Sequence, residues 1–366
     1  MERKPVVLIL TSSEERGGAA ENLAEAIRAD GAYNVVILDE KRYGVKVPFE
    51  RLRPALFAAD RRRLLRSGAA SAGRLLKKRK GRPRGRNRRV ANAVKRYAPE
   101  YVLTVTPYAQ AAFVEAKRRA GFEVPSVHTV LAFVLPEEDY PAYAADVYLV
   151  ENTEVRDSLV ARGIPAKHVV ICGLPFDAPR VTPIEAEEGK QELGLPRTPT
   201  VFVNADGRDA VEIAGLVADQ GDIVNMVCFA EDVKLLAALR TNAERSDPGR
   251  NAVILTRRDM FGEYLLMSDI VITRYDPSVI YKCFKAGKPV IAFGRNAEEA
   301  ANLEYLAERR LIMRAASDID VVALIYKFMQ TDVSSEYVEN GLARAEMFSS
   351  SNTANYLAAY AGGKNA

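Results

Sequence analysis

The segment from residue 267 to residue 294 constrains the fold more than any other part of the chain. A short β-branched run at 270–272 leads into Asp276-Pro277-Ser278, and a second apolar run covers 289–293. The middle tripeptide suits a helix N-cap with proline in the first turn. Two strands joined through a helix in this way predict a βαβ unit, and the N-terminus of its helix favours an anion.

The same alternation of strands and helices fills both halves of the chain. Strands are predicted near residues 5–10, 35–39, 101–106, 126–133, 145–151 and 168–172, and again near 200–204, 222–228 and 251–255. This pattern predicts an α/β fold with two doubly wound, largely parallel sheets that face each other across a cleft. Prolines between 175 and 199 indicate a linker. The expected domains are 1–178, joined by a returning C-terminal helix at 335–366, and 179–334.

Composition narrows the class of protein. A length of 366 residues exceeds what one hydrophobic core usually holds, and 48% hydrophobic with 27% charged residues indicates a globular chain. No apolar run approaches the roughly 20 residues of a membrane span, so we expect a cytoplasmic protein. Three cysteines without a CxxC pair and two histidines indicate neither a zinc site nor a disulfide framework. We therefore expect no metal and no cofactor.

Positive charge is concentrated in one insertion of the first domain, at residues 61–96. This segment holds sixteen Lys or Arg and no acidic residue, so the rest of the chain carries a net charge of −12. Leucines beside arginines suit a segment that lies on an anionic membrane, which predicts peripheral association with its inner face. The expected membrane contacts are Arg61, Arg62, Leu64, Leu65, Arg74, Leu75, Leu76, Lys77 and Lys78.

Two other interpretations of the basic segment remain open. Nucleic acid also attracts basic stretches, but no aromatic residue lies between Asp60 and Tyr97, so base stacking has no support there and a nucleic-acid partner is not expected. A solvated loop is the other interpretation, because charge runs usually face water.

Several passages together resemble one group of glycosyltransferases. Residues 147–175 match a strand, a helix, Gly163-Ile164-Pro165, a strand and Gly173-Leu174-Pro175, and Asn296–Asn302 is similar to a "G-Q-E-x-x-N" box. The chain thus resembles GT-B glycosyltransferases of the monogalactosyldiacylglycerol synthase, processive diacylglycerol glucosyltransferase and lipid II N-acetylglucosaminyl transferase group. The resemblance implies a nucleotide sugar, with UDP as its nucleotide, bound by the second domain.

The chain departs from this group at the positions that carry chemistry. The pattern "G-G-x-T-x-x-E" is replaced by the stretch from Asp276 to Lys282, and lysine cannot accept hydrogen bonds from a ribose. The aspartate and histidine of "T-D-x-x-x-H" are replaced by Ala132 and Pro136. The resemblance, together with the residues around the βαβ unit at 267–294, gives these expected donor contacts: Asn204, Gly207, Arg257, Asp276, Ser278, Lys282, Glu298, Glu299 and Asn302.

The loops that follow strands of the first domain contain carboxylates that are candidates to replace the missing aspartate and histidine. An inverting transfer needs a base for the acceptor hydroxyl and positive groups for the departing diphosphate. The candidate bases are Glu14, Glu15 and Glu137, although a hydrated loop carboxylate is the plainer interpretation of each. Arg16, Gly17 and Gly18 are candidates for an acceptor or phosphate site at a helix start. His128, inside an apolar strand, is interpreted as a core residue.

Two hypotheses follow from these observations. The first is a divergent glycosyltransferase that moves a sugar from a nucleotide diphosphate sugar to a lipid-linked or glycolipid acceptor at the membrane surface. The second is a GT-B pseudoenzyme that binds or scaffolds components of a membrane glycan pathway without catalysis, because the aspartate, histidine and glutamate positions are lost together.

Overall fold

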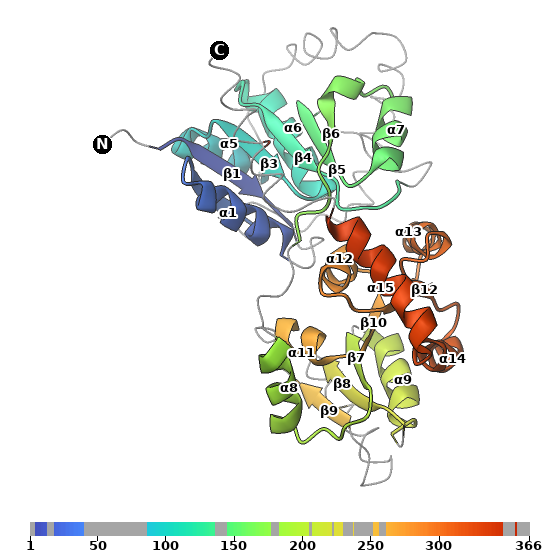
Figure 1. Cartoon of the computed structure of the whole chain (residues 1–366). Coiled ribbons are helices and arrows are strands. Elements are labelled where there is room, and N and C mark those ends of the chain that lie inside the picture. The colour runs from blue at the N-terminus through green and yellow to red at the C-terminus, as the bar shows by residue number, and fades with distance from the viewer. Residues whose placement is uncertain are drawn as a thin grey trace. The chain divides into compact units, whose positions relative to one another are not determined.

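A computed structural model describes residues 4–12, 18–39, 86–135, 145–176, 183–204, 207–221, 223–229, 237, 252–255, 261–346 and 356. The chain forms two compact units, one made of Met1–Phe176 with Phe348–Ala366 and the other of Asp177–Met347. Each unit has its own sheet and its own core, and the two are described separately (Figure 1).

In the described part of the first unit, six parallel strands form one sheet in the order β2-β1-β3-β4-β5-β6. Helix α6 shows how the sequence sets the elements: Thr106 caps its first turn, Pro107 follows, and Gly121 ends it at φ 73°. The strands are β1 (Val6–Leu10), β2 (Asn34–Leu38), β3 (Tyr101–Thr104), β4 (Ser126–Thr129), β5 (Val147–Val150) and β6 (Val169–Ile171). The helices are α1 (Ala19–Asp30), α5 (Arg86–Tyr97), α6 (Pro107–Ala120), α7 (Thr153–Ala161) and the 3-10 turn η4 (Ala166–His168).

Helices cover both faces of this first sheet. Alternate strand residues such as Val7, Ile9 and Leu103 pack against α1, with Tyr356 at the edge of the same cluster. Their neighbours along the strands, such as Leu8 and Val102, pack against α5 and α6 on the opposite face, and α7 covers β5 there. Burial on both faces explains why β1 and β5 are continuously apolar rather than alternating with polar residues, whereas β4 (Ser-Val-His-Thr) buries polar side chains.

In the described part of the second unit, six parallel strands form a sheet in the order β12-β11-β10-β7-β8-β9. The strands are β7 (Thr200–Asn204), β8 (Asn225–Phe229), β9 (Ala252–Leu255), β10 (Ile270–Arg274), β11 (Val290–Phe293) and β12 (Met313–Arg314). The helices are α8 (Pro183–Glu192), α9 (Gly207–Ala218), α11 (Phe261–Met267), α12 (Pro277–Lys285), α13 (Ala297–Glu308), α14 (Asp318–Phe328) and α15 (Thr331–Glu346).

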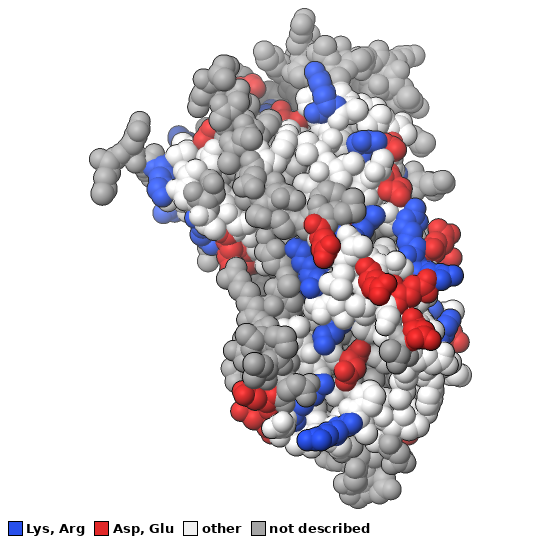
Figure 2. Space-filling view, viewed as in Figure 1, with Lys and Arg blue, Asp and Glu red and all other residues white. Residues whose placement is uncertain are grey.

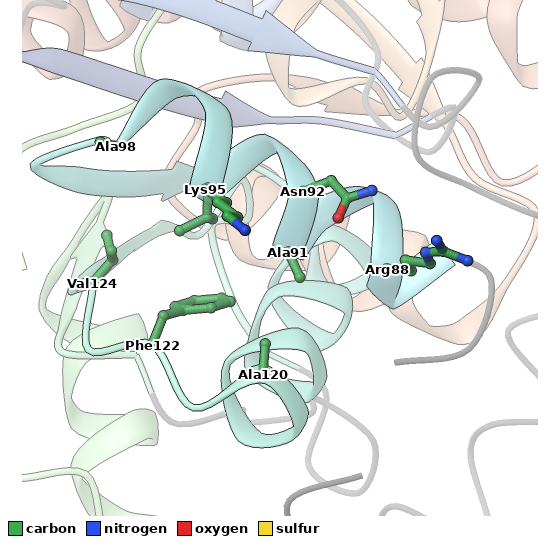
Figure 3. A pocket seen from close by; sticks show the side chains of 9 residues that line it. Arg88, Ala91, Asn92, Lys95, Ala98, Ala120, Phe122 and Val124 are labelled. Carbon is green, nitrogen blue, oxygen red and sulfur yellow. The ribbon is translucent and has the colours of Figure 1, made fainter. Parts of the chain in front are cut away.

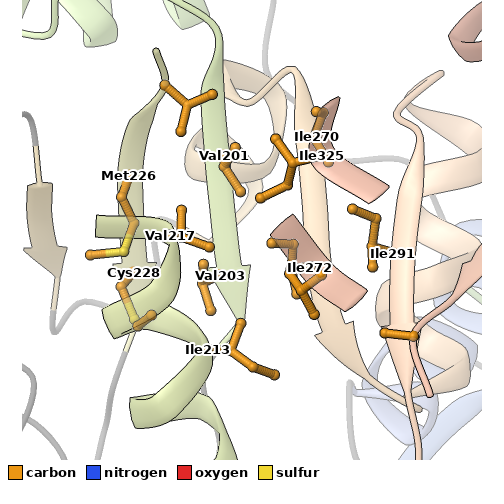
Figure 4. Packing of buried hydrophobic residues seen from close by; sticks show 14 of the residues in the cluster. Val201, Val203, Ile213, Val217, Met226, Cys228, Ile270, Ile272, Ile291 and Ile325 are labelled. Atoms are coloured by element: carbon orange, nitrogen blue, oxygen red, sulfur yellow. The ribbon is translucent and has the colours of Figure 1, made fainter. Parts of the chain in front are cut away.

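One face of the second sheet forms a core with α9 and α14. Side chains from neighbouring strands, among them Val203, Ile272 and Ile291, meet Val217 of α9 and Ile325 of α14 (Figure 4). These residues are at most 1% exposed, and each fully buried aliphatic side chain contributes about 1.5–3 kcal/mol relative to an exposed one. On the opposite face the Phe202 ring meets the ring of Phe261 in α11, with centroids 5.4 Å apart.

The predicted fold class, two parallel α/β sheets of the doubly wound kind, is confirmed. The βαβ unit expected between 267 and 294 is present as β10, α12 and β11. The basic segment at 61–96 overlaps α5, whose Val90 and Val94 lie in the core of the first unit. Its residues 61–85, with all nine expected membrane contacts, lie outside the described residues. Helix α15 packs against α12 within the second unit.

Charged side chains on the visible face are mixed in sign. Figure 2 shows described lysines and arginines interspersed with aspartates and glutamates rather than gathered into one patch. Within the described ranges, no helix has both the length and the apolar composition needed to cross a membrane.

Helices α12 and α15 approach closely at a glycine. A β-carbon on Gly341 of α15 would lie 3.0 Å from Cδ1 of Phe284, a buried residue of α12. Atoms in real proteins rarely come this close, so the contact depends on the missing side chain and leaves little room for a larger residue.

We predict that Gly341→Val lowers the free energy of unfolding by about 1–3 kcal/mol, because the branched side chain overpacks against Phe284. Urea denaturation followed by circular dichroism measures the change. Ala343→Val is the matched control, since Ala343 is exposed on the same helix and pays only a propensity cost of about 0.5 kcal/mol. Equal losses in the two variants would contradict the packing argument.

Candidate functional site

The strand order of the second unit reverses beside β7. From β7 the chain continues outward through β8 and β9, and then returns to β10 on the other side of β7. Ligands of open α/β sheets bind beyond the carboxyl ends of the strands at such a reversal. The candidate site is therefore the edge where β7 ends at Asn204 and β10 ends at Arg274.

A side-chain hydrogen bond joins the two strand ends. Asn204 and Thr273 are paired in register, and Asn204 Nδ2 donates to Thr273 Oγ1 at 3.0 Å. Thr273 is fully buried and Asn204 is half-buried. Burying polar side chains in the middle of a central strand costs free energy. Asn204 and Thr273 lie instead at the carboxyl ends of β7 and β10, which makes this edge a candidate site.

An ion pair links β10 to the next helix start. Arg274 Nε donates to Glu299 Oε2 at 3.1 Å, and the Arg274 guanidinium also contacts Glu299 Oε1. The side chains are only 17% and 12% exposed. Glu299 Oε2 also accepts the backbone N–H of Arg295 at 2.7 Å. A carboxylate in the first turn is favoured by the helix dipole, and burial strengthens the pair relative to one at the surface.

The N-terminus of α13 is closed by a second side chain. Glu299 N–H donates to Oδ1 of Asn296 at 2.8 Å, which is an N-cap. Arg274 is thus the cation that faces this end of α13, and Glu299 is the anion that holds it there.

Helix α12 begins beside the end of β10 with its own carboxylate. Asp276 Oδ1 accepts the backbone N–H groups of Ser278 at 2.9 Å and Val279 at 3.3 Å. Pro277 has no N–H, so these are the first amides of the helix. The Ser278 hydroxyl is buried, and it has no hydrogen-bond partner among the described residues. The helix start at which an anion was expected is therefore present, but the carboxylate of Asp276 already accepts its first two N–H groups.

The structure brings most of the expected donor residues to this edge. Gly207 begins α9 just after β7, and Glu298 is exposed in the first turn of α13. Lys282 is half-buried, more than one turn along α12. Asn302 is buried, and its Nδ2 donates to Glu298 O at 3.0 Å. Arg257 lies outside the described residues.

Sequence reasoning missed Thr273 and gave Arg274 no contact. Both belong to β10. Thr273 reads as an ordinary strand residue, and Arg274 was noted only as a positive charge beside the βαβ unit. Their place at the last positions of a strand that ends at the reversal was the available signal.

The first unit has its own reversal, between β1 and β3. Beyond these strand ends, Ser12 Oγ and Thr106 Oγ1 are 3.0 Å apart, and both residues are buried. Thr106 also caps α6 by accepting the Ala109 N–H at 3.1 Å. Gly18 is the N-cap of α1 with φ 77°, a conformation that favours glycine. The other expected acceptor-side residues, Glu14, Glu15, Arg16, Gly17 and Glu137, lie outside the described residues.

His128 is a buried member of a polar network. Its Nδ1 lies 2.9 Å from Thr104 Oγ1, which donates to Gln110 Oε1 at 2.7 Å. Burial lowers the pKa of His128 to about 4, against the opposing effect of a hydrogen bond with the backbone of Thr104. The imidazole is thus neutral at physiological pH and fills the core, as the sequence interpretation holds.

Metal chemistry finds no support in the part of the chain that the structure describes. No group of three or more His, Cys, Asp or Glu side chains there could hold an ion. The three cysteines, Cys172, Cys228 and Cys283, are buried and unpaired with one another.

No protein-family model matches the chain, and no curated protein matches it either. Solved structures do match. Anabaena Alr3699/HepE in complex with UDP and glucose has a TM-score of 0.61 at 14% identity, and the match covers 98% of this chain and 100% of that one. Acinetobacter baumannii MurG has a TM-score of 0.59 at 12% identity, with coverage of 96% and 98%. The fold is GT-B.

The reaction is not fixed by this likeness. The UDP-GlcNAc 2-epimerase of Neisseria meningitidis bound to UDP-GlcNAc matches as well, with a TM-score of 0.62, 12% identity and coverage of 97% and 100%. At these identities the likeness establishes the fold alone, so chemistry has to be argued from the site.

We predict that the His128 imidazole stays neutral until the pH approaches 4. Because its folded pKa lies below the unfolded value near 6.5, the unfolded state binds the proton more tightly. Stability is therefore lost as pH falls from about 6.5 to about 4, by about 3 kcal/mol in total.

Proton NMR of the His168→Asn variant measures this titration, because His128 is then the only histidine. Its C2–H resonance should not shift between pH 7.5 and 5.5. A midpoint near 6.5 would contradict the burial argument, and urea midpoints at pH 7 and pH 4.5 provide a second measurement.

Proposed function

We propose that the chain is a glycosyltransferase that uses a nucleotide diphosphate sugar, held at the carboxyl edge of the second sheet. The observation that carries the proposal is Arg274, a largely buried guanidinium at the end of β10, directed at the first turn of α13. A charge placed at the strand reversal suits a diphosphate, since guanidinium and phosphate pair in two-pronged geometry.

The residues around Arg274 have complementary roles in this proposal. The N-termini of α12 and α13 add positive potential where the diphosphate leaves. Asn204 offers an amide beside it, held in place by its hydrogen bond to Thr273, and the buried Ser278 hydroxyl has an unused hydrogen-bonding capacity that a phosphate oxygen would satisfy. Asn204, Gly207, Glu298 and Glu299 are the proposed sugar and diphosphate contacts, and no metal or cofactor is invoked.

UDP is the proposed nucleotide. HepE was solved with UDP and glucose, and the Neisseria epimerase with UDP-GlcNAc, so two chains of this fold bind uridine nucleotides. The backbone from Leu255 to Arg257, at the end of β9, is the proposed base contact. The proposed base for the acceptor hydroxyl is one of Glu14, Glu15 and Glu137, because each follows a strand of the first unit.

A second candidate function is nucleotide binding without transfer. Asp276 accepts the first amides of α12, and Glu299 pairs with Arg274, so two of the positive elements of this edge already have an anion. A site in this condition suits a pseudoenzyme that binds its ligand by displacing a carboxylate and then acts as a scaffold.

We predict that UDP binds to the wild type and that Arg274→Ala weakens binding about tenfold or more, through loss of a charge-assisted contact. Isothermal titration calorimetry measures the affinity. Arg309→Ala is the matched control: Arg309 lies at the opposite end of α13, where it stacks on Tyr305 with its guanidinium carbon 3.8 Å from the ring centroid.

Donor turnover separates the two candidates. Wild-type protein is incubated with UDP-sugars, GDP-sugars and a lipid extract, and released nucleotide and glycosylated lipid are detected by mass spectrometry. Transfer supports the enzyme, whereas UDP binding without donor consumption favours the pseudoenzyme. Absence of nucleotide binding, or equal losses in Arg274→Ala and Arg309→Ala, would overturn the proposed site.

The proposed acceptor is a lipid-linked sugar or glycolipid, reached at the cytoplasmic face of an anionic membrane. The support is sequence alone: residues 61–85 combine leucine pairs with a dense positive charge. Each basic residue near an anionic surface contributes on the order of 1 kcal/mol, so this charge suffices for peripheral association.

We predict that the wild type floats with phosphatidylglycerol vesicles and that replacing Arg61, Arg62, Arg74, Lys77 and Lys78 by alanine abolishes flotation. A matched variant with alanine at Leu64, Leu65, Leu75 and Leu76 keeps the charge and should float more weakly. Flotation of the charge variant at the wild-type level would contradict the proposal. Binding to RNA but not to vesicles would instead support the nucleic-acid interpretation.

A further inference from the structure

A cavity of about 830 Å³ opens in the first unit, between α5 and the segment that connects α6 to β4 (Figure 3). Helix α5 ends just before β3 begins, and α6 ends just before β4 begins. The cavity therefore lies near the amino ends of these parallel strands. This is the edge opposite the carboxyl ends at which α/β sheets bind their substrates, so the cavity is distinct from the proposed acceptor region.

One stripe of α5 forms the first wall. Arg88, Ala91, Asn92 and Lys95 follow the i, i+3, i+4, i+7 spacing, which places them on one side of the helix. Val94 is buried at the base of the cavity. Arg88 and Lys95 are separated by seven residues, or about 10 Å along the axis, so the two cations lie toward different ends of the wall.

The second wall is apolar. It consists of Ala120 at the end of α6, then Phe122 and Val124. Figure 3 shows Ala91 directed toward Ala120, with the Phe122 ring beside them. Phe122 is half-buried and packs on Phe113, with ring centroids 5.6 Å apart and an interplanar angle of 49°. The ring is thus fixed from behind and presents a rigid surface to the cavity.

Ala98 follows the last residue of α5 and lines the cavity there. Its backbone conformation is unusual. Its φ is 43°, in the left-handed region where helices usually end with glycine. A non-glycine residue there costs on the order of 1–2 kcal/mol, and such strain concentrates at ligand sites. The methyl group retained at this cost is one of the apolar groups that line the cavity.

The charges of the cavity are of one sign. Among the described residues, its lining contains two basic side chains and no acidic one. Within the described residues neither Arg88 nor Lys95 forms an ion pair, whereas Arg118 and Arg119 on nearby α6 both pair with Glu115. The two cations of the cavity are therefore available to an anionic ligand.

We propose that this cavity binds a single-chain anionic amphiphile, an alkyl phosphate or fatty carboxylate. The head group pairs with Lys95, Arg88 adds positive potential from the other end of the wall, and the chain lies between Ala91 and the wall from Ala120 to Val124. Of the described lining residues, Asn92 alone has a neutral hydrogen-bonding side chain, which is too few for a nucleotide base and ribose. The volume is within the usual range for small-molecule sites.

The ligand has two possible sources, a free amphiphile in solution or one that is accessible at a membrane surface. The chemistry is the same in both. The inference is independent of donor binding, because every residue involved lies in the first unit and none belongs to the proposed nucleotide site.

The test uses calorimetry of the full chain with decyl phosphate below its micellar concentration, beside inorganic phosphate and decanol. We expect decyl phosphate to bind and the two fragments to bind at least about tenfold more weakly, because each supplies one half of the contacts. Lys95→Glu and Arg88→Glu should each weaken binding about tenfold, and Ala120→Phe, which places a ring between the two walls where the chain would lie, should abolish it.

Arg89→Glu with Arg96→Glu is the matched control, since both residues are exposed on α5 and neither lines the cavity. Equal losses in this control, equal binding of decanol or phosphate, or undiminished binding by Ala120→Phe would each overturn the proposal. Sedimentation with neutral vesicles that contain a few per cent decyl phosphate then identifies the source. Cosedimentation lost in Lys95→Glu indicates the membrane, and its absence in the wild type indicates the free amphiphile.

Discussion

All the described strand pairs of both sheets run parallel, and this one constraint arranges the candidate site of the second unit. Parallel strands need a crossover after each one, so the carboxyl ends of β7, β10 and β11 meet at one edge together with the helix starts that follow them. Residues distant in sequence become neighbours for this reason: Asn204 meets Thr273, and Arg274 meets Glu299. Burial on both faces keeps the strands apolar, which leaves that edge as the place for polar groups.

The periodicity of the sequence was sufficient to predict the fold class, because short β-branched runs and helix signals alternate through both halves of the chain. Asp276 with Pro277 indicates a helix start from local chemistry alone, and the structure has a helix there. Thr106, assigned to the strand predicted at 101–106, is instead the N-cap of α6. The order of the strands could not be obtained in this way. It depends on packing between distant segments, and it decides that β7 and β10, rather than β7 and β9, are adjacent.

The site could be predicted only in outline. Asp276 and Ser278 were found because a helix N-terminus has a sequence signature. Arg274 was undervalued because the value of a strand-end arginine depends on the partner that folding brings to it, here Glu299. The cavity on α5 was hidden for the same reason: Arg88 and Lys95 looked like two charges in a basic run, and only the chain reversal after α6 places Phe122 opposite them.

The carboxylate of Asp276 also acts as a tethered competitor. Because it is joined to the helix that it caps, it is present at an effective concentration that a ligand in solution has to exceed before it reaches the same amides. The measured affinity of any anion for the start of α12 is therefore the difference between the binding of that anion and the binding of the Asp276 carboxylate that it displaces. The folding of α12, in turn, does not depend on a ligand.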